Sequence, residues 1–580
     1  MNFDTLIEGA TVYDGTGRMP YRADIALAGG RIADIGQLDD AAADRRIDAR
    51  GKVLCPGFID VHSHADTVVH FDTHAETLEP LLRQGITTFV GGNCGMGLAP
   101  IRPKFREQFM AYVEMFLGRS QEGQIHWSTM AEYLDHIESR GMVMNYAMLA
   151  PHGIIRLAAM GLDRSLASPD QLMEMGDLLR ECLDAGCVGM STGLQYFPGL
   201  SADEDELVEL GKQISAADGV FTSHIRSYSN TLPQAIDELM AISRRSGVKV
   251  QLSHLFWVPH VNLYVDRVVN SIARVGAAIY KHVKIPVPLD LAMREKLQYM
   301  GDEIRRGLPM GMDAMPTGAG FTHALAFFPP WALEGTREEI TNRLRDPAQR
   351  QKIHASIVNG KSVWPHRDGD TWSMNFFQVM GFQSVHLMSV PEGKNSKYIG
   401  KHFVEIGKLR GQHPFDAVCD MLLEEDGKVL VFETPTWPGD EFTERSVYAS
   451  IADPNVSIVT DSILIGQGKP SHLFYDCYPK LFGKYVREEK RLSLEEAVRK
   501  STSLPAKQLG IPKRGEIRRG WWADLVLFDA ETVDTNSTAS EPDVFPTGVE
   551  YVFVNGHAAV SPAGYHPEPR KGRVVRRGEN

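Results

Sequence analysis

The sequence predicts an α/β protein built on a (β/α)8 barrel of the TIM type, with a small β-sandwich domain formed by both chain ends. In the middle of the chain, apolar strand-like segments alternate with amphipathic helical ones, as in "DELVELGKQISAADG" followed by "VFTSHIRSY". Repeated alternation of this kind indicates parallel βαβ units. Both ends instead carry short strands joined by Gly and Asp turns. A doubly wound open sheet has the same alternation, so periodicity alone leaves the closure of the barrel open.

The two strand-rich ends are expected to pair with each other. Residues 1–57 contain "DTLIEGATVYDGTG" and "ADIALAGGRIADIG", and residues 508–580 contain "WADLVLFDAETV" and "VEYVFVNGHAAV". We therefore predict one β-domain from these two segments and a catalytic barrel over residues 58–507. Residues 260–308 and 320–440 interrupt the alternation and are interpreted as insertions over the active-site face, since long connections usually carry function.

Composition limits the partners and the compartment. The chain has 580 residues, 43% hydrophobic and 23% charged, and a formal net charge of -13. An acidic surface repels nucleic acid and anionic membranes, so neither is expected as a partner. There is no apolar run near ~18 residues to predict a membrane span, and the acidic start of the chain lacks a signal-peptide pattern. We expect a cytoplasmic protein that acts on a small molecule.

Six potential metal ligands occur where apolar strands stop. His62 and His64 lie two residues apart in "GFIDVHSH", so both side chains project from one face of a strand. The other four end the segments "TTFVGGNC", "GVFTSH", "KVQLSH" and "NVSIVTD", and they are Cys94, His224, His254 and Asp461. In a parallel barrel all strand ends of one sense meet on one face. The sequence therefore predicts that these six side chains converge.

The types of these residues favour zinc. Imidazole and thiolate groups are donors that Zn²⁺ accepts at roughly 2.0–2.3 Å. A catalytic zinc site must keep a position open for water, and six candidate ligands allow that for either one or two ions per chain. Six scattered cysteines without a CxxC pair do not form a disulfide framework. Cys94 is the one cysteine for which a ligand role is expected.

The chain resembles the D-aminoacylase branch (N-acyl-D-amino-acid deacylases) of the amidohydrolase superfamily. The segments that carry the resemblance include "GFIDVHSHAD", "LLRQGITTFVGGNCGMGLAP", "GMSTGLQYFPG", "QLSHL", "SIVTDS" and "RGEIRRGWWADLVLFDAETV". They extend over most of the chain except the two insertions. The resemblance implies a (β/α)8 barrel with a small β-sandwich from both chain ends, which agrees with the fold predicted from periodicity.

The resemblance also implies roles for individual residues. Cys94, His224 and His254 would hold a tightly bound zinc ion, and His62 and His64 would be ligands of a second, weaker metal position. Asp461, also a metal ligand, would take a proton from the metal-bound water and pass it to the leaving nitrogen. Tyr196, in "STGLQYFPG", would line the site and hydrogen-bond the developing oxyanion.

The departures from the family pattern fall on substrate recognition. The family uses a lysine, a tyrosine and an arginine to bind the substrate α-carboxylate, and Phe256, Met315 and Leu473 take these positions here. Tyr228 replaces a glutamate of the family's "HxRxE" pattern. Each lost charge-assisted hydrogen bond would cost roughly 1.5–3 kcal/mol. We therefore predict an intact hydrolytic centre acting on a neutral, apolar or aromatic N-acyl amide. Aromatic residues that could add to such a pocket are Trp257, Phe321, Trp364 and Trp372.

Alternative functions remain open at this point. One is a true N-acyl-D-amino-acid deacylase whose carboxylate donors have moved, with Arg226 or a residue of the insertions in their place. A cyclic amide, a carbamate or an ester is another class of substrate, because the same nucleophile attacks each. A non-catalytic scaffold is disfavoured because all six ligands are present. A metal-assisted isomerase or decarboxylase is a further minor alternative. Barrels of this class often associate, so a homo-oligomer is compatible with the sequence.

Overall fold

The central sheet consists of eight parallel strands arranged as predicted for a barrel. The computed structural model describes all residues except 1, 118–122, 259–262, 281, 285–287, 361–362, 366–374, 392, 435–439, 464–467, 539–540 and 580. The strands follow one another in chain order, each paired with the next. They are β6 (Phe58–Asp60), β7 (Ile86–Gly91), β8 (Asn145–Pro151), β9 (Gly189–Gly193), β10 (Val220–His224), β11 (Lys249–Leu252), β12 (Met310–Ala314) and β16 (Val456–Ile458).

Backbone pairing just beyond β6 and β16 brings the two edges of this sheet together. Ser63 forms a parallel bridge with Ser462. The amide of His64 donates to the carbonyl of Ser462 at 2.8 Å, and the amide of Asp461 donates to the carbonyl of His62 at 2.9 Å. An open, doubly wound sheet would leave these edges apart, so the barrel prediction is confirmed.

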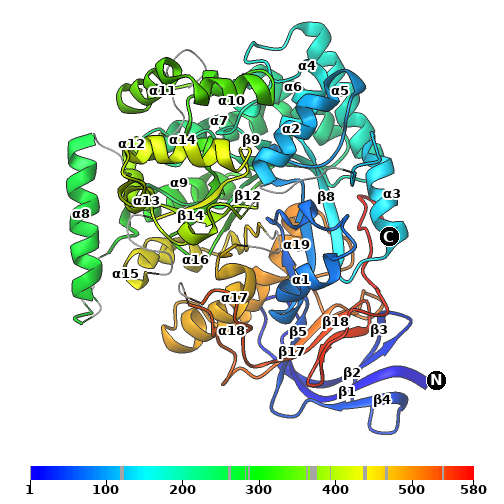
Figure 1. Cartoon of the computed structure of the whole chain (residues 1–580). Helices are drawn as coiled ribbons and strands as arrows, with labels where there is room; N and C mark the ends of the chain where they lie inside the picture. Colours follow the sequence, from blue (N-terminus) through cyan, green and yellow to red (C-terminus); the bar gives the residue numbers. More distant parts are fainter. Residues whose placement is uncertain are drawn as a thin grey trace.

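Amphipathic helices between the strands surround the barrel (Figure 1). Several begin at the side-chain caps that the sequence carries. Ser168 and Gln171 form a capping box at the start of α5, and Asp203 caps α6 through the amide of Glu206. The principal outer helices are α1 (His74–Arg83), α2 (Arg106–Leu117), α3 (Met130–Arg140), α4 (His152–Met160), α5 (Pro169–Asp184), α6 (Glu204–Ala216), α7 (Leu232–Ser246), α9 (Leu291–Arg305), α16 (Tyr448–Ala452), α17 (Leu473–Lys480), α18 (Leu494–Ser501) and α19 (Ser503–Leu509).

The two chain ends share one nine-stranded sheet, which lies below the barrel in Figure 1. β5 and β17 join the N- and C-terminal parts in antiparallel pairing, with Leu525 opposite Pro56. The strands are β1 (Asn2–Val12), β2 (Tyr21–Ala28), β3 (Arg31–Gly36), β4 (Ala42–Asp48), β5 (Val53–Pro56), β17 (Leu525–Phe528), β18 (Val549–Val554), β19 (His557–Ser561) and β20 (Gly564–Tyr565).

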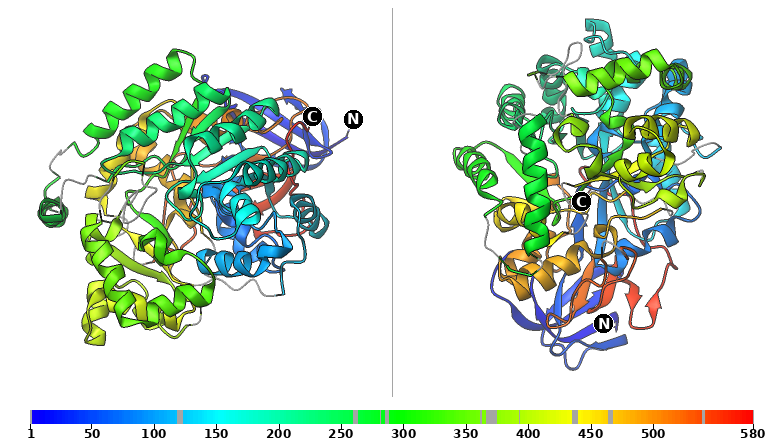
Figure 2. Two further views of the ribbon diagram at one scale, coloured as in Figure 1. Left: turned by 90° about the horizontal axis from the view of Figure 1, so that it is seen from above. Right: turned by 60° about the vertical axis from the view of Figure 1, so that its left-hand side comes forward.

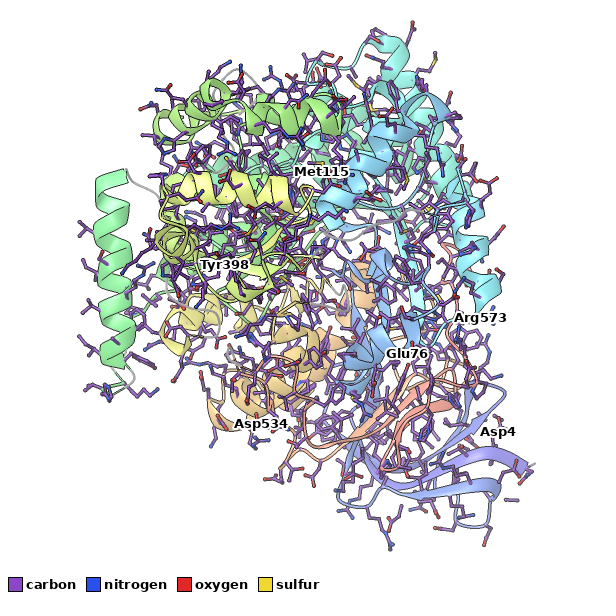
Figure 3. The ribbon with its side chains drawn as sticks, in the orientation of Figure 1. Asp4, Glu76, Met115, Tyr398, Asp534 and Arg573 are labelled. Atoms are coloured by element: carbon purple, nitrogen blue, oxygen red, sulfur yellow. The ribbon has the colours of Figure 1, made fainter. Side chains whose placement is uncertain are left out.

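After β20 the chain returns to the barrel. The carbonyl of Arg573, labelled in Figure 3, accepts a hydrogen bond from the amide of Tyr146 on β8 at 2.9 Å. The amide of Val575 donates to the carbonyl of Tyr146 at 2.7 Å. The C-terminal segment thus binds the small sheet and the barrel to each other.

Residues 260–308 contain two helices with different positions. α9 directly precedes β12, and its Tyr299 hydroxyl donates to Asp237 of α7 at 2.7 Å, so α9 lies in the ring around the barrel. α8 (Leu263–Tyr280) lies at the left edge of the molecule in Figure 1 and in front of the other elements in the right-hand view of Figure 2. Among the helices of the described residues, none is long and apolar enough to cross a membrane.

The described residues of 320–440 form a separate layer with its own antiparallel sheet, in the order β13, β15, β14. β13 (Gly320–His323) and β14 (Val385–Ser389) each pair with β15 (Leu430–Glu433). The helices of this layer are α10 (Arg337–Arg345), α11 (Pro347–Asn359), α12 (Phe376–Val379), α13 (Phe403–Arg410) and α14 (Pro414–Glu424), followed by α15 (Glu441–Glu444). This layer matters for function because one of its strands reaches the barrel mouth.

Candidate metal centre

The six predicted ligands lie together at the carboxyl ends of the barrel strands, and all are buried. Three of them, Cys94, His254 and Asp461, have a left-handed backbone with φ of 54°, 34° and 50°. Such a conformation costs a non-glycine residue about 1–3 kcal/mol and is concentrated at functional sites. Here it turns the chain sharply after the strand. Gly193, at the end of β9, permits the turn at Cys94, because any Cβ there would overlap the Cys94 carbonyl.

One set of donor atoms forms a compact triad. The Sγ of Cys94 lies 3.7 Å from Nδ1 of His224 and 3.6 Å from Nε2 of His254. These two ring nitrogens are 2.9 Å apart. Tetrahedral zinc, with bonds of about 2.0–2.3 Å, separates its nitrogen and sulfur ligands by roughly 3.3–3.7 Å. The spacing of the triad is therefore close to what one ion requires.

The other three candidates form a second set that shares the same space. Nε2 of His62 and Nε2 of His64 each lie 3.5 Å from Oδ1 of Asp461. Nε2 of His62 is also 3.3 Å from Sγ of Cys94, so His62 lies between the two sets. The donor atoms of His62, His64 and Asp461 all fall within 4.8 Å of one another, as do those of His62, Cys94 and His254.

The electrostatics of the donor set fit a metal. Burial, and then the neighbouring histidines, hold the pKa of His62 and His224 well below the usual value, so both rings are neutral. Burial, and then the charge of Asp461, raise the pKa of the Cys94 thiol. The buried Nδ1 atoms of His62 and His254 have no hydrogen-bond partner among the described residues, and against the effect of burial the carboxylate of Asp461 raises the pKa of His64. A divalent cation satisfies such a set, with release of the thiol proton.

Gln195 fixes the orientation of one ligand. Its Oε1 lies 2.9 Å from Nε2 of His224, on the side of the ring away from Cys94. An amide oxygen there accepts a hydrogen bond from the Nε2–H group, which leaves the lone pair of Nδ1 for the metal. The neighbouring residue Tyr196 packs its ring 4.6 Å from that of His224.

Replacing Gln195 with leucine should weaken zinc binding by about 10- to 100-fold, because the tautomer of His224 is no longer fixed. Competition with a chromophoric chelator measures this affinity. Gln195→Glu keeps an acceptor oxygen at the same place and should retain most of the affinity. Equal zinc affinities for wild type and Gln195→Leu would contradict this role.

A cavity of about 30 Å³ adjoins the ligands. It has room for one or two water molecules. Candidate ligands form one part of its lining, and residues of β13 form another. The lining residues are His64, Cys94, Met96, Tyr196, His254, Phe321, Thr322, His323, Asp461 and Ile463. An amide substrate is larger than this cavity, so some of the lining residues must move apart for it to bind.

The residues predicted to bind substrate are placed differently from the ligands. The guanidinium of Arg226 donates to Glu238 at 2.9 Å and to the carbonyls of Leu200 and Ala202 at 2.7 and 2.6 Å. Arg226 thus connects the segments after β9 and β10, and its guanidinium donates to these partners. The hydroxyl of Tyr228 donates to the carbonyl of Ser253 at 3.0 Å.

The three apolar positions also differ in their surroundings. Phe256 stacks on Tyr228 with ring centroids 4.4 Å apart and lies 6.0 Å from the ring of His254. Met315, after β12, and Leu473, at the start of α17, are buried in the core and are not among the residues lining the cavity. Of the four aromatic candidates, Phe321 lines the cavity and Trp257 and Trp364 do not. Trp372 lies outside the described residues.

Several residues that the structure brings to the centre could not be selected from the sequence. Asp313 accepts a hydrogen bond from the amide of His254 at 2.6 Å and so holds the left-handed turn at that ligand. Thr322 donates to the hydroxyl of Tyr196 at 3.4 Å. Glu433 of β15 lies near enough to Asp461 for that charge to affect its pKa. Asp313 lies near the end of a barrel strand, as the candidate ligands do, and this position could have indicated it. Thr322 and Glu433 belong to the inserted layer, where no comparable sequence pattern marks a residue of the site.

The stability of the protein should depend on pH through Glu433. Burial, and then the charge of Asp461, raise its pKa to about 8, whereas the same group ionises near 4.3 in an unfolded chain. Glu433 therefore lowers the stability of the fold as pH rises between these two values, by at most about 1.4 kcal/mol per pH unit. The melting temperature of Glu433→Gln should exceed that of wild type by more at pH 8 than at pH 5. A constant difference would contradict the shift.

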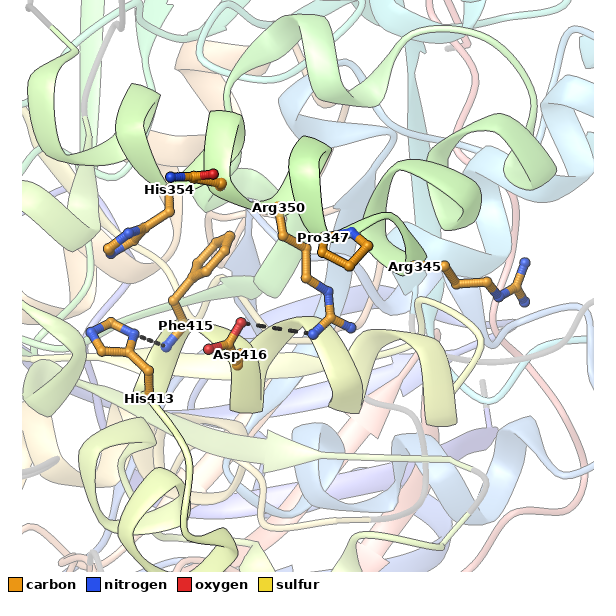
Figure 4. A pocket seen from close by; sticks show the side chains of 8 residues that line it. Arg345, Pro347, Arg350, His354, His413, Phe415 and Asp416 are labelled. Atoms are coloured by element: carbon orange, nitrogen blue, oxygen red, sulfur yellow. Dashed lines mark hydrogen bonds and ion pairs between the residues drawn. The ribbon is translucent and has the colours of Figure 1, made fainter.

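A wider hollow of about 420 Å³ lies in the inserted layer, between α11 and α14 (Figure 4). Its polar groups pair with one another. Arg350 lies 3.8 Å from Asp416, and Nδ1 of His413 accepts a hydrogen bond from the amide of Phe415 at 3.1 Å. None of the six candidate ligands lines it. The cavity beside Cys94 and Asp461 is therefore the candidate active site.

Known proteins resemble the chain over nearly its full length. The model of the amidohydrolase family matches residues 45–314 and 452–560. N-acyl-D-glutamate deacylase of Alcaligenes xylosoxydans xylosoxydans is 30% identical over 575 residues, which cover 99% of this chain and 96% of that protein. D-aminoacylase of the same organism is 27% identical over 554 residues, covering 96% and 94%.

Solved structures agree with these relatives. The crystal structure of D-aminoacylase superposes with a TM-score of 0.74 at 25% identity, covering 99% of this chain and 100% of that one. The same values hold for N-acyl-D-glutamate deacylase of Bordetella bronchiseptica, solved with zinc and a phosphonate inhibitor that mimics the tetrahedral intermediate. With the ligands converging at the barrel mouth, these matches show that the chain belongs to the amidohydrolase family and is a metal-dependent hydrolase of carbon–nitrogen bonds.

Proposed function

We propose that this protein is a zinc hydrolase that cleaves the C–N bond of a small N-acyl amide. The observation that carries the proposal is the convergence of Cys94, His224 and His254 within 3.7 Å of one another, beside the carboxylate of Asp461. The triad would hold one ion, and His62 and His64 would contribute to a second position. The D-aminoacylase relative was studied with a binuclear metal centre that is activated by one metal and attenuated by the second. We propose that here too the ion at the triad supports activity and that an ion at the second position is not required.

Zinc bound at the triad would polarise the scissile carbonyl and lower the pKa of a water molecule. Asp461 would accept a proton from the attacking water and deliver it to the leaving nitrogen as general base and acid. Its position 3.5 Å from both His62 and His64 supports this role. Tyr196 would donate to the carbonyl oxygen as negative charge develops there. Burial raises the pKa of the Tyr196 hydroxyl well above its usual value, so the hydroxyl keeps its proton.

We propose a neutral, apolar or aromatic acyl amide as the substrate. Phe256, Met315 and Leu473 offer no charge to a carboxylate, and Arg226 already donates to Glu238 and two carbonyls. The second candidate is an N-acyl-D-amino acid, favoured by the 30% identity to N-acyl-D-glutamate deacylase. Cyclic amides, carbamates and esters suit the same chemistry but no contact favours them.

Turnover by the zinc-loaded enzyme distinguishes the two candidates. The panel pairs N-acetyl-D-amino acids with uncharged aryl and alkyl amides of similar size, and release of the free amine is measured. We expect the uncharged amides to be hydrolysed with a kcat/KM at least about tenfold higher, since the carboxylate would lose charge-assisted hydrogen bonds. Preferred hydrolysis of the N-acetyl-D-amino acids would overturn the substrate assignment and leave the hydrolytic centre unaffected.

A further inference from the structure

A buried glutamate of the inserted layer lies beside the active-site cavity. β13 supplies Phe321, Thr322 and His323 to the cavity lining, and β15 pairs with it in antiparallel register. Glu433 on β15 stands directly opposite Gly320. A Cβ on Gly320 would lie 3.1 Å from Oε1 of Glu433, so the carboxyl extends over a position that carries no side chain.

The face of β13 that carries this carboxyl is turned toward the catalytic residues. Directly paired residues of antiparallel strands project to the same face, and alternate residues share it. Glu433 therefore shares a face with Thr322, whose hydroxyl donates to that of Tyr196 at 3.4 Å. Burial is the main cause of the raised pKa of Tyr196 and of Glu433, and smaller contributions come from the charge of Glu433 on Tyr196 and of Asp461 on Glu433. Both effects place Glu433 near the reacting groups.

Within the described residues, the carboxyl of Glu433 has unused hydrogen-bonding capacity. Its side chain is 92% buried, since the residue is only 8% exposed, and Oε2 has no hydrogen-bond partner. No Lys, Arg or His of the described part of the chain forms an ion pair with it. A buried carboxyl left in this state is costly to the fold, and such groups are generally kept where a ligand completes them.

We propose that the carboxyl of Glu433 binds an N–H group on the amine part of the substrate. This group would be either a primary carboxamide or an ammonium. The inference rests on the proposed function as an amide hydrolase and specifies which chemical group of the substrate Glu433 contacts. Phe256, Met315 and Leu473 offer no positive charge to a substrate carboxylate, whereas Glu433 offers a hydrogen-bond acceptor. β13 and β15 are hydrogen-bonded in one sheet, so Glu433 belongs to the same sheet as the strand that lines the cavity.

This position lies outside the segments that match the family model. The matched residues are 45–314 and 452–560, and β13, β14 and β15 fall between them. The catalytic residues therefore belong to the shared part of the chain, whereas Glu433 belongs to a part that the family model does not match. A specificity group in that layer can change without disturbing the ligands.

Direct binding to a form that cannot turn over tests the proposal. Zinc-loaded Asp461→Asn protein is titrated calorimetrically with four derivatives of N-acetylphenylalanine that differ at one end. These are the primary amide, the analogue ending in an ammonium group, the methyl ester and the free carboxylate. The amide or the ammonium compound should bind about 10- to 100-fold more tightly than the ester and the carboxylate. Tighter binding of the amide would identify a neutral donor, and tighter binding of the ammonium compound would identify a cation.

The same titrations with Glu433→Leu added should remove this preference. Glu405→Gln, an exposed glutamate of α13 in the same layer, serves as the matched control and should keep it. The proposal would be overturned if all four compounds bound equally, if the carboxylate bound more tightly, or if none bound. It would also be overturned if the preference persisted in Glu433→Leu. Turnover of the same compounds by wild-type enzyme reports separately on the proposed hydrolase, so the two failures are distinguishable.

Discussion

Replacing Asp461 with asparagine is expected to lower kcat by about 100- to 10,000-fold, the usual contribution of a general acid–base group. Asparagine has the same shape and tolerates the left-handed backbone at this position, where φ is 50°. It cannot accept the proton of the attacking water. The loss should therefore appear in kcat, with KM nearly unchanged. Steady-state kinetics on the best amide of the panel provides the measurement.

The matched control is Asp218→Asn. Asp218 also has a left-handed backbone, with φ of 51°, but its side chain is 87% exposed at the turn before β10. This places it at the opposite end of the barrel strands from the ligands. The control should keep full activity. Zinc analysis of Asp461→Asn should still find an ion at the Cys94, His224 and His254 triad. Full activity in Asp461→Asn would exclude this residue as the acid–base group.

Removal of the metal, or of Cys94, is expected to have the second large effect. Cys94→Ser keeps the size of the side chain but replaces a thiolate with a hydroxyl, a much poorer zinc ligand. Zinc affinity should fall by more than about 100-fold, and activity at limiting zinc should fall with it. The fold should also lose stability on chelation, because ligand at about 1,000 times its Kd stabilises a protein by about 4 kcal/mol.

Thermal unfolding with and without zinc measures the second part of this prediction. Wild type should melt at a higher temperature with zinc, and Cys94→Ser should not respond to the same concentration. Cys419→Ser is the control, because this cysteine is equally buried but lies on α14 away from the ligands. It should keep the zinc response of wild type. A Cys94→Ser protein with unchanged zinc content would contradict the assignment of the triad.

Local sequence patterns, together with the family resemblance, were sufficient to predict the barrel and the convergence of the six candidate ligands. Strand and helix periods depend on residues a few positions apart, and a parallel barrel brings all strand ends of one sense to one face. For that reason His62, Cys94, His224 and Asp461 could be predicted to meet although nearly 400 residues separate the first from the last. The family resemblance also marked Phe256, Met315 and Leu473 as apolar residues at positions where polar ones are expected.

Only the tertiary structure decided which groups surround these ligands. Gln195 faces His224 because of the turn after β9, and Glu433 lies beside the cavity-lining strand β13 because β15 pairs with β13 across more than 100 residues of intervening chain. Arg226 is engaged by Glu238, which lies on a different element. Such contacts depend on strand register, backbone turns and side-chain direction between distant segments. Local periodicity carries no information about them, so the sequence determined the chemistry of the centre and the tertiary structure determined its surroundings.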